Sequence, residues 1–144
     1  MTEMILLDTN VVSAFMASAP PPAVLRWLNA QIGSSLYLCS ITVAEIEYGL
    51  RLLPEGKRRS FLRERFHTFV RLVFEGRLLN FDADAAELYG EIAAQRRAAG
   101  RPISTLDAQI AAICRSRGCR LATRNTRDFS DCGLELLDPF QKVG

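Results

Sequence analysis

The stretch MILLDTN, residues 4–10, combines a run of apolar residues with an acid placed directly after it. Four apolar residues in a row leave no polar face, so residues 4–8 are predicted to form a short strand buried in a sheet. In an open parallel sheet, ligands bind beyond the carboxyl ends of the strands, which is where Asp8 stands. Asp8 is therefore placed to hold a cation, although Asp8 or Thr9 could equally serve only as the cap of the next helix.

Length and composition are those of a globular protein. The chain has 144 residues, of which 49% are hydrophobic and 24% charged. We expect one domain over residues 1–144, long enough to bury a sizeable core. A net charge of +2 is too small to indicate nucleic-acid binding by itself. No run of eighteen apolar residues occurs and no cysteine pair has the two-residue gap of a zinc motif, so we expect a cytoplasmic protein with reduced thiols and no membrane contact.

Strand-like and helix-like segments alternate along the chain. Apolar runs predict strands at about residues 4–8, 36–39, 77–81, 120–123 and 134–137. Prolines, glycines and capping residues delimit the helices predicted at about residues 10–18, 22–32, 40–53, 56–74, 82–100 and 104–117. This alternation predicts an α/β sandwich around a mostly parallel sheet.

Acidic residues recur where the predicted helices begin. Each has a purely structural explanation: Thr42-x-x-Glu45 has the spacing of a capping box, and Ser104-x-x-Asp107 is a weaker version of it. Glu45 and Asp107 are expected in the first turns of their helices, and Asn125-x-x-Asp128 follows the strand at 120–123. Four junctions thus carry an acid, namely Asp8, Glu45, Asp107 and Asp128.

Taken together, these acids indicate a metal site. The carboxyl ends of the strands and the start of the helix with Asp107 can fall at one edge of the sheet. Two unit charges 4 Å apart repel by about 4 kcal/mol at an effective dielectric near 20, so a cluster of carboxylates is kept where a divalent cation neutralises it. Oxygen ligands favour Mg²⁺ or Mn²⁺ over zinc. Hydrolysis of a phosphodiester by metal-activated water is the chemistry that such a site favours.

Four stretches around these acids resemble the PIN-domain family, and within it the VapC toxins, especially their FitB-like branch. The resemblance covers nearly the whole chain in one order, and it implies a three-layer α/β/α sandwich with a central, mostly parallel sheet of four or five strands. The stretches are ILLDTNVVS (5–13), ITVAEIEYG (41–49), ISTLDAQIAA (103–112) and LATRNTRDF (121–129).

The resemblance implies a Mg²⁺-dependent endoribonuclease, the toxin of a type II toxin–antitoxin system, with Mn²⁺ as a possible substitute. In that family the acids that match Asp8, Glu45 and Asp107 form the metal site, and Asp8 and Asp107 are the usual direct ligands. The side chains of Thr9 and Asn10 usually support the site.

The fourth position of the site has two candidates. Some relatives carry an acid where this chain has Asn125, whose amide can orient a water or a carboxylate but adds no charge. Asp128, three residues further along, could supply the fourth carboxylate instead.

The resemblance also implies partners. The family forms homodimers, in some cases within larger toxin–antitoxin assemblies, and binds a small antitoxin whose C-terminal segment covers the active groove. Apolar side chains near Phe15, Trp27 and Tyr48 could serve such contacts, or they could be core residues. Phosphate contacts to RNA are expected first from Arg124 and Arg127, unless these are ordinary solvated arginines. Next come the arginines that flank the loop before Asp107, which are Arg96, Arg97 and Arg101.

Alternative functions remain within and outside this family. A housekeeping PIN nuclease without an antitoxin, or a nuclease-inactive PIN scaffold that binds protein or RNA, would share the same fold. A phosphatase or a receiver-like domain would need a lysine at a strand end, and none occurs between Lys57 and Lys142. A phosphatase of that type would also need an Asp-x-Asp pair, but the residue two after Asp8 is Asn10.

Overall fold

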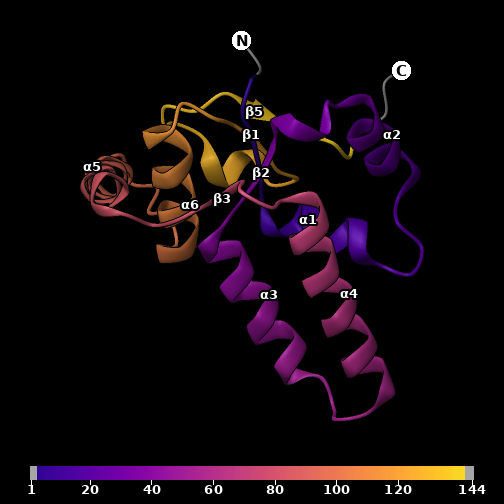
Figure 1. Ribbon diagram of the computed structural model, residues 1–144. Coiled ribbons are helices and arrows are strands. Elements are labelled where there is room, and N and C mark those ends of the chain that lie inside the picture. Colours follow the sequence, from indigo (N-terminus) through magenta and orange to yellow (C-terminus); the bar gives the residue numbers. More distant parts are fainter. Residues whose placement is uncertain (1–2, 142–144) are drawn as a thin grey trace.

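The computed structural model describes residues 3–141, which form a five-stranded sheet with helices on both faces (Figure 1). The strand order is β3-β2-β1-β4-β5, and every neighbouring pair is parallel. The predicted α/β/α sandwich is thus confirmed, with a sheet that is entirely parallel. The strands are β1 (Ile5–Leu7), β2 (Leu36–Cys39), β3 (Leu78–Leu79), β4 (Arg120–Ala122) and β5 (Leu136–Leu137).

Within the described residues, six α-helices and two short 3₁₀ helices connect the strands. Local chemistry explains several ends: Pro22 opens its helix at the first position, Asp82 caps the next-to-last α-helix, and Gly100 adopts φ 75° just beyond that helix. The α-helices are α1 (Thr9–Met16), α2 (Pro22–Ala30), α3 (Ser40–Leu52), α4 (Lys57–Val73), α5 (Ala83–Ala98) and α6 (Thr105–Ser116). The 3₁₀ helices are η1 (Gly33–Ser35) and η2 (Thr126–Phe129).

The sheet separates two apolar clusters, as the alternation of side chains along a strand requires. On one face, Leu6 and Leu121 pack with side chains of α5 and α6. On the other face, Leu7 and Ala122 pack with side chains of α1, α3 and α4. Because strand β1 is buried on both faces, its sequence reads as a continuous apolar run.

Strand β1 lies at the centre of the sheet, and its carboxyl end is the point from which the site is built. The chain leaves β1 for β2 on one side, whereas β4 pairs with β1 on the other side. Such a reversal of strand order creates a crevice beyond the carboxyl ends of the central strands. Asp8, Ser40 and Thr123 directly follow β1, β2 and β4, so the sheet brings these three positions to one edge.

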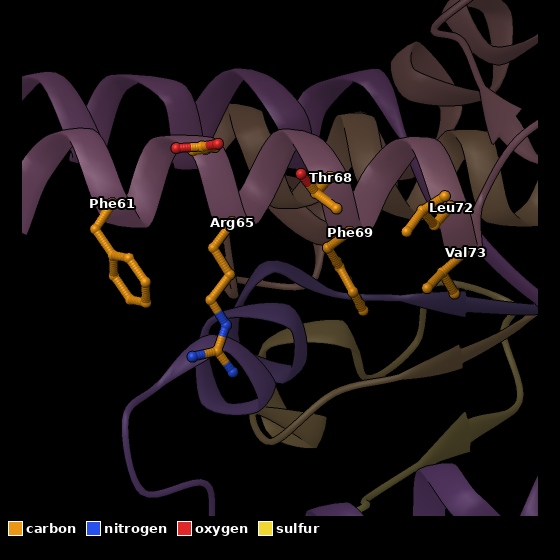
Figure 2. A pocket seen from close by; sticks show the side chains of 7 residues that line it. Phe61, Arg65, Thr68, Phe69, Leu72 and Val73 are labelled. Atoms are coloured by element: carbon orange, nitrogen blue, oxygen red, sulfur yellow. The ribbon is translucent and has the colours of Figure 1, made fainter.

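The α3–α4 hairpin extends away from the sheet (Figure 1). It carries the exposed apolar side chains of Tyr48, Leu52, Phe61 and Leu72. A hollow of about 470 Å³ runs along α4, and Figure 2 shows Phe61, Arg65 and Phe69 projecting toward it from one side of the helix. Phe61 is 61% exposed and Leu72 at the other end is 73% exposed. Exposed apolar side chains gathered around a hollow are typical of a surface that binds another protein.

Of the three aromatic residues considered for partner contacts, two belong to the core and one is exposed. Phe15 and Trp27 pack against the core, whereas Tyr48 is 67% exposed on α3. All four cysteines are buried and none is in a disulfide. Within residues 3–141, no helix is both long enough and apolar enough to cross a membrane.

Candidate active site

Asp8 is buried, 4% exposed, and its carboxylate is held by three donors. Oδ1 accepts a hydrogen bond from the N–H of Thr9 at 2.8 Å, so Asp8 caps α1. Oδ2 accepts from the Thr123 hydroxyl at 2.7 Å and from the Asn10 amide at 3.3 Å. Burial raises the pKa of Asp8 to about 6; the bonds from Thr123 and Thr9 oppose this rise, and the negative charges of Asp107 and Glu45 add to it. Asp8 therefore caps α1, and its ionised form is disfavoured by burial and by the neighbouring negative charges.

Thr123 joins the two ends of the site, a role that the sequence reading missed. Besides donating to Asp8, its fully buried hydroxyl accepts from the N–H of Asn125 at 3.0 Å. The Asn10 side chain completes the link, because its Oδ1 accepts from the N–H of Arg124 at 3.2 Å. The position of Thr123 in the sequence could have indicated this role, because it is the first polar residue after β4. The pairing of Leu7 with Ala122 places it beside Asp8.

Glu45 reaches the same edge from α3. The Thr9 hydroxyl donates to Glu45 Oε1 at 2.9 Å, and Thr42 Oγ1 lies 3.2 Å from that hydroxyl. The expected capping box was wrong, because α3 begins at Ser40 without a side-chain cap and Glu45 therefore lies beyond its first turn. The chain passes from β2 directly into the helix, so Thr42 and Glu45 are free to bond with Thr9 instead of with the helix end.

Asp107 and Asp128 form the other side of the edge. Asp107 lies in the first turn of α6, as predicted, and its N–H donates to the capping Ser104 hydroxyl at 3.2 Å. Burial raises the pKa of Asp107; a side-chain hydrogen bond from Ser104 and the charge of Arg96 oppose this rise, whereas the charge of Asp128 adds to it. A cavity of about 210 Å³ lies between them, lined by Arg96, Pro102, Ile103, Ser104, Asp107 and Asp128.

The two candidates for the fourth position differ in their surroundings. Asp128 lies in η2 and lines the cavity with Asp107. Asn125 is exposed and contacts the site through its main-chain N–H, which donates to Thr123. The geometry around Asp107 thus favours Asp128, because that acid shares its cavity.

The arginines near the edge divide into buried and exposed ones. The expectation that Arg96 contacts RNA phosphate is wrong, because its side chain is buried and donates to main-chain carbonyls. Arg101 is paired with Asp131 at the surface. Arg97 and Arg127 are exposed, and Arg124 is exposed with its guanidinium 4.9 Å from the centre of the Phe140 ring.

The donor set suits a hard divalent cation. Within the part of the chain that the structure describes, no three acidic, histidine or cysteine side chains lie close enough to hold one ion alone. The acids therefore lie at one edge of the sheet and influence one another's pKa, but they do not surround a single ion position. Mg²⁺ fits such an edge, because it takes one or two carboxylates and keeps several waters. Burial is the largest cause of the raised pKa of Asp8, and the charges of Asp107 and Glu45 add to it, so a bound cation would favour the ionised form of this acid.

The chain is similar to known proteins along nearly its whole length. The PIN domain model matches residues 5–133. The VapC ribonuclease Y4jK of Sinorhizobium fredii is 41% identical over 138 residues, which cover 96% of this chain and 99% of the relative. The plasmid stability protein StbB of Pseudomonas syringae pv. tomato is 44% identical over the same shares of both chains.

A solved structure extends the similarity to three dimensions. FitAcB from Neisseria gonorrhoeae superimposes with a TM-score of 0.90 at 36% identity, covering 96% of this chain and 100% of that chain. The chain therefore belongs to the PIN-domain family, and within it to the VapC toxins, as its four motifs predicted.

Proposed function

We propose that this protein is the toxin ribonuclease of a type II toxin–antitoxin pair and that it cuts RNA phosphodiesters at the edge formed by Asp8, Glu45 and Asp107. Membership of the VapC toxins makes it a hydrolase. The observation that carries the location of the site is the buried Asp8, which three donors fix in place while two further acids act on its charge.

Asp8 and Asp107 would hold Mg²⁺, and Mn²⁺ could replace it. PIN-domain nucleases are generally metal-dependent, and oxygen donors of this kind suit either ion. A bound ion would supply a Lewis acid that activates water and neutralises charge on the phosphate. Glu45, whose Oε1 accepts from the Thr9 hydroxyl, would orient a water molecule.

Exposed arginines beside the acids would hold the RNA backbone. Arg124 is the strongest candidate, because its main-chain N–H is bound to Asn10 and its side chain is exposed. Arg127 lies in η2 and is also exposed. Contacts of this kind position the phosphate backbone and carry no sequence specificity by themselves.

The partners would be a second copy of the chain and a small antitoxin. FitAcB is a complex and the matching VapBC structures are toxin–antitoxin systems. The hollow along α4, between Phe61 and Leu72, fits an apolar segment of an antitoxin. Co-expression with the product of a short neighbouring reading frame is expected to give a stable complex. That complex should fail to form with Phe61→Asp/Leu72→Asp, and its formation with this variant would reject the hollow as the contact.

The experiment for the catalytic proposal compares two aspartates that both cap helices. Asp8→Asn is expected to abolish Mg²⁺-dependent RNA cleavage without unfolding the protein, whereas Asp82→Asn leaves cleavage unchanged. Asp82 caps α5 through Ala85, and asparagine is an equally good cap, so the second variant controls for helix effects. Unchanged cleavage by Asp8→Asn would reject the site.

A further inference from the structure

Arg96 is a buried cation that joins the two segments carrying Asp107 and Asp128. Its side chain leaves α5 and is 6% exposed. Nε donates to the carbonyl oxygen of Arg101 at 2.7 Å, in the loop that leads into α6. Nη1 donates to the carbonyl oxygens of Asp128 at 2.8 Å and Ser130 at 3.0 Å. One guanidinium thus binds the main chain on both sides of the cavity.

The cost of this arrangement indicates that it does more than fill space. Burying a cation without an ion pair is unfavourable, and within residues 3–141 Arg96 makes none. A methionine of similar length would pack there without that cost. A guanidinium is instead a rigid, planar group whose donors hold their acceptors at defined relative positions.

The bonds act on main-chain atoms, and this determines what Arg96 controls. The carbonyl that it binds belongs to Asp128 itself, so the placement of that acid depends directly on Arg96. Phe129 anchors η2 to the core, and the bonds from Arg96 to the carbonyl oxygens of Asp128 and Ser130 flank that anchor on both sides. Arg96 also lines the cavity of about 210 Å³, where its positive charge lies near both acids.

We infer that Arg96 is a positioning residue that holds Asp128 against Asp107 by binding the main chain of both segments. The inference rests on the proposed nuclease function and on Asp128 completing the site. Arg96 itself touches no substrate in this scheme. Its contribution is to keep two acids of like sign facing one cavity before any cation is bound.

Arg96→Lys tests this inference, since lysine keeps the charge but cannot bind the three carbonyl groups in the same geometry. The expected result is a loss of cleavage rate of about tenfold, as for other groups that orient metal ligands. Introduced into Asp128→Asn, the same change should reduce the remaining rate less than twofold, because the acid that Arg96 positions is already gone. An equal loss in both backgrounds would overturn the proposal.

Arg77→Lys is the matched control. Arg77 also donates to main-chain carbonyls, those of Leu36 and Val73, but it lies before β3, away from the acid edge. Arg77→Lys is expected to reduce the free energy of unfolding, while the loss of cleavage rate caused by Asp128→Asn stays the same with or without it. If Arg77→Lys altered that effect as much as Arg96→Lys does, general loosening of the fold would replace positioning as the explanation.

Hydrogen exchange supplies a readout that is independent of activity. In Arg96→Lys, amides of residues 126–132 should exchange faster, whereas those of residues 5–16 should not change. Faster exchange in both segments, or in neither, would contradict the inference even if the cleavage rate fell. If Arg96→Lys does not fold, Arg96→Gln is measured in its place, and failure of both to fold would reject a local role. Failure of the nuclease function would show separately, as unchanged cleavage by Asp8→Asn.

Discussion

Asp8 and Asp107 lie at the same edge of the sheet and near the start of a helix, yet their surroundings are opposite. Asp8 is buried and accepts three hydrogen bonds. Asp107 is only partly buried, and the side-chain hydrogen bond that lowers its pKa comes from Ser104, its near neighbour at the start of α6. The fold thus fixes one acid and leaves the other adjustable. In the proposed metal site, Asp8 would then be the rigid ligand and Asp107 the more adjustable one.

The largest effect should come from lengthening each acid by one methylene. Asp8→Glu is expected to destabilise the protein by about 1–3 kcal/mol, because the buried site has no room for it. Cleavage should fall by roughly 10³-fold, since the variant displaces a group that contributes several kcal/mol. Asp107→Glu should fold like the original chain and keep cleavage within about tenfold of it. Urea denaturation and initial cleavage rates measure both, and equal behaviour of the two variants would remove the distinction.

The pH dependence of stability sharpens the comparison in metal-free protein. Because the pKa of Asp8 is raised from 3.8 to about 6, the folded state binds more protons than the unfolded state between these values. The free energy of unfolding should therefore decrease as pH rises from about 4 to 7, by up to about 3 kcal/mol. Denaturation in a chelating buffer measures this slope. Asp8→Asn should reduce the slope of stability against pH more than Asp107→Asn does. If Asp8→Asn had the same slope as the original chain, the raised pKa of Asp8 would be contradicted.

Thr9→Val removes the hydroxyl that holds Glu45 and connects it to the Asp8 side of the edge. We expect cleavage to fall by about 10–100-fold, as for other groups that orient a ligand. Thr9→Ser keeps the hydroxyl and should restore most of the rate. A variant with valine that cleaves normally would show that Glu45 needs no support.

The smallest effect is expected at Asn125. Its side chain is exposed and its main-chain N–H makes the contact with Thr123, so Asn125→Ala should change the cleavage rate less than about twofold. Asp128→Asn should lower the rate by about tenfold, because Asp128 shares a cavity with Asp107. The reverse order in a cleavage assay would assign the fourth position to Asn125.

The fold was largely predictable because its signals are local. Apolar runs marked the five strands, and proline, glycine and Asp82 marked helix ends within a few residues. The junctions with Asp8 and Asp107 were predictable for the same reason, since an acid after an apolar run or a serine is visible in a short window.

The features that the sequence did not predict depend on contacts between distant segments. Arg96 and Arg97 stand side by side in the sequence, and only the packing of α5 against α6 and η2 decides which is buried. The spacing of Thr42 and Glu45 predicts a cap, but the partner they share is Thr9, more than thirty positions earlier. Thr123 gained its role from a pairing 115 positions long.

That pairing has a consequence for synthesis on the ribosome. Asp8 is translated 115 residues before Thr123, which carries the hydroxyl that holds it. Strand β4, which carries Thr123 to the centre of the sheet, must leave the exit tunnel before the edge can close. A chain that has not yet reached Thr123 therefore lacks the hydroxyl that holds Asp8, so the edge proposed to cut RNA cannot assemble before that residue is made.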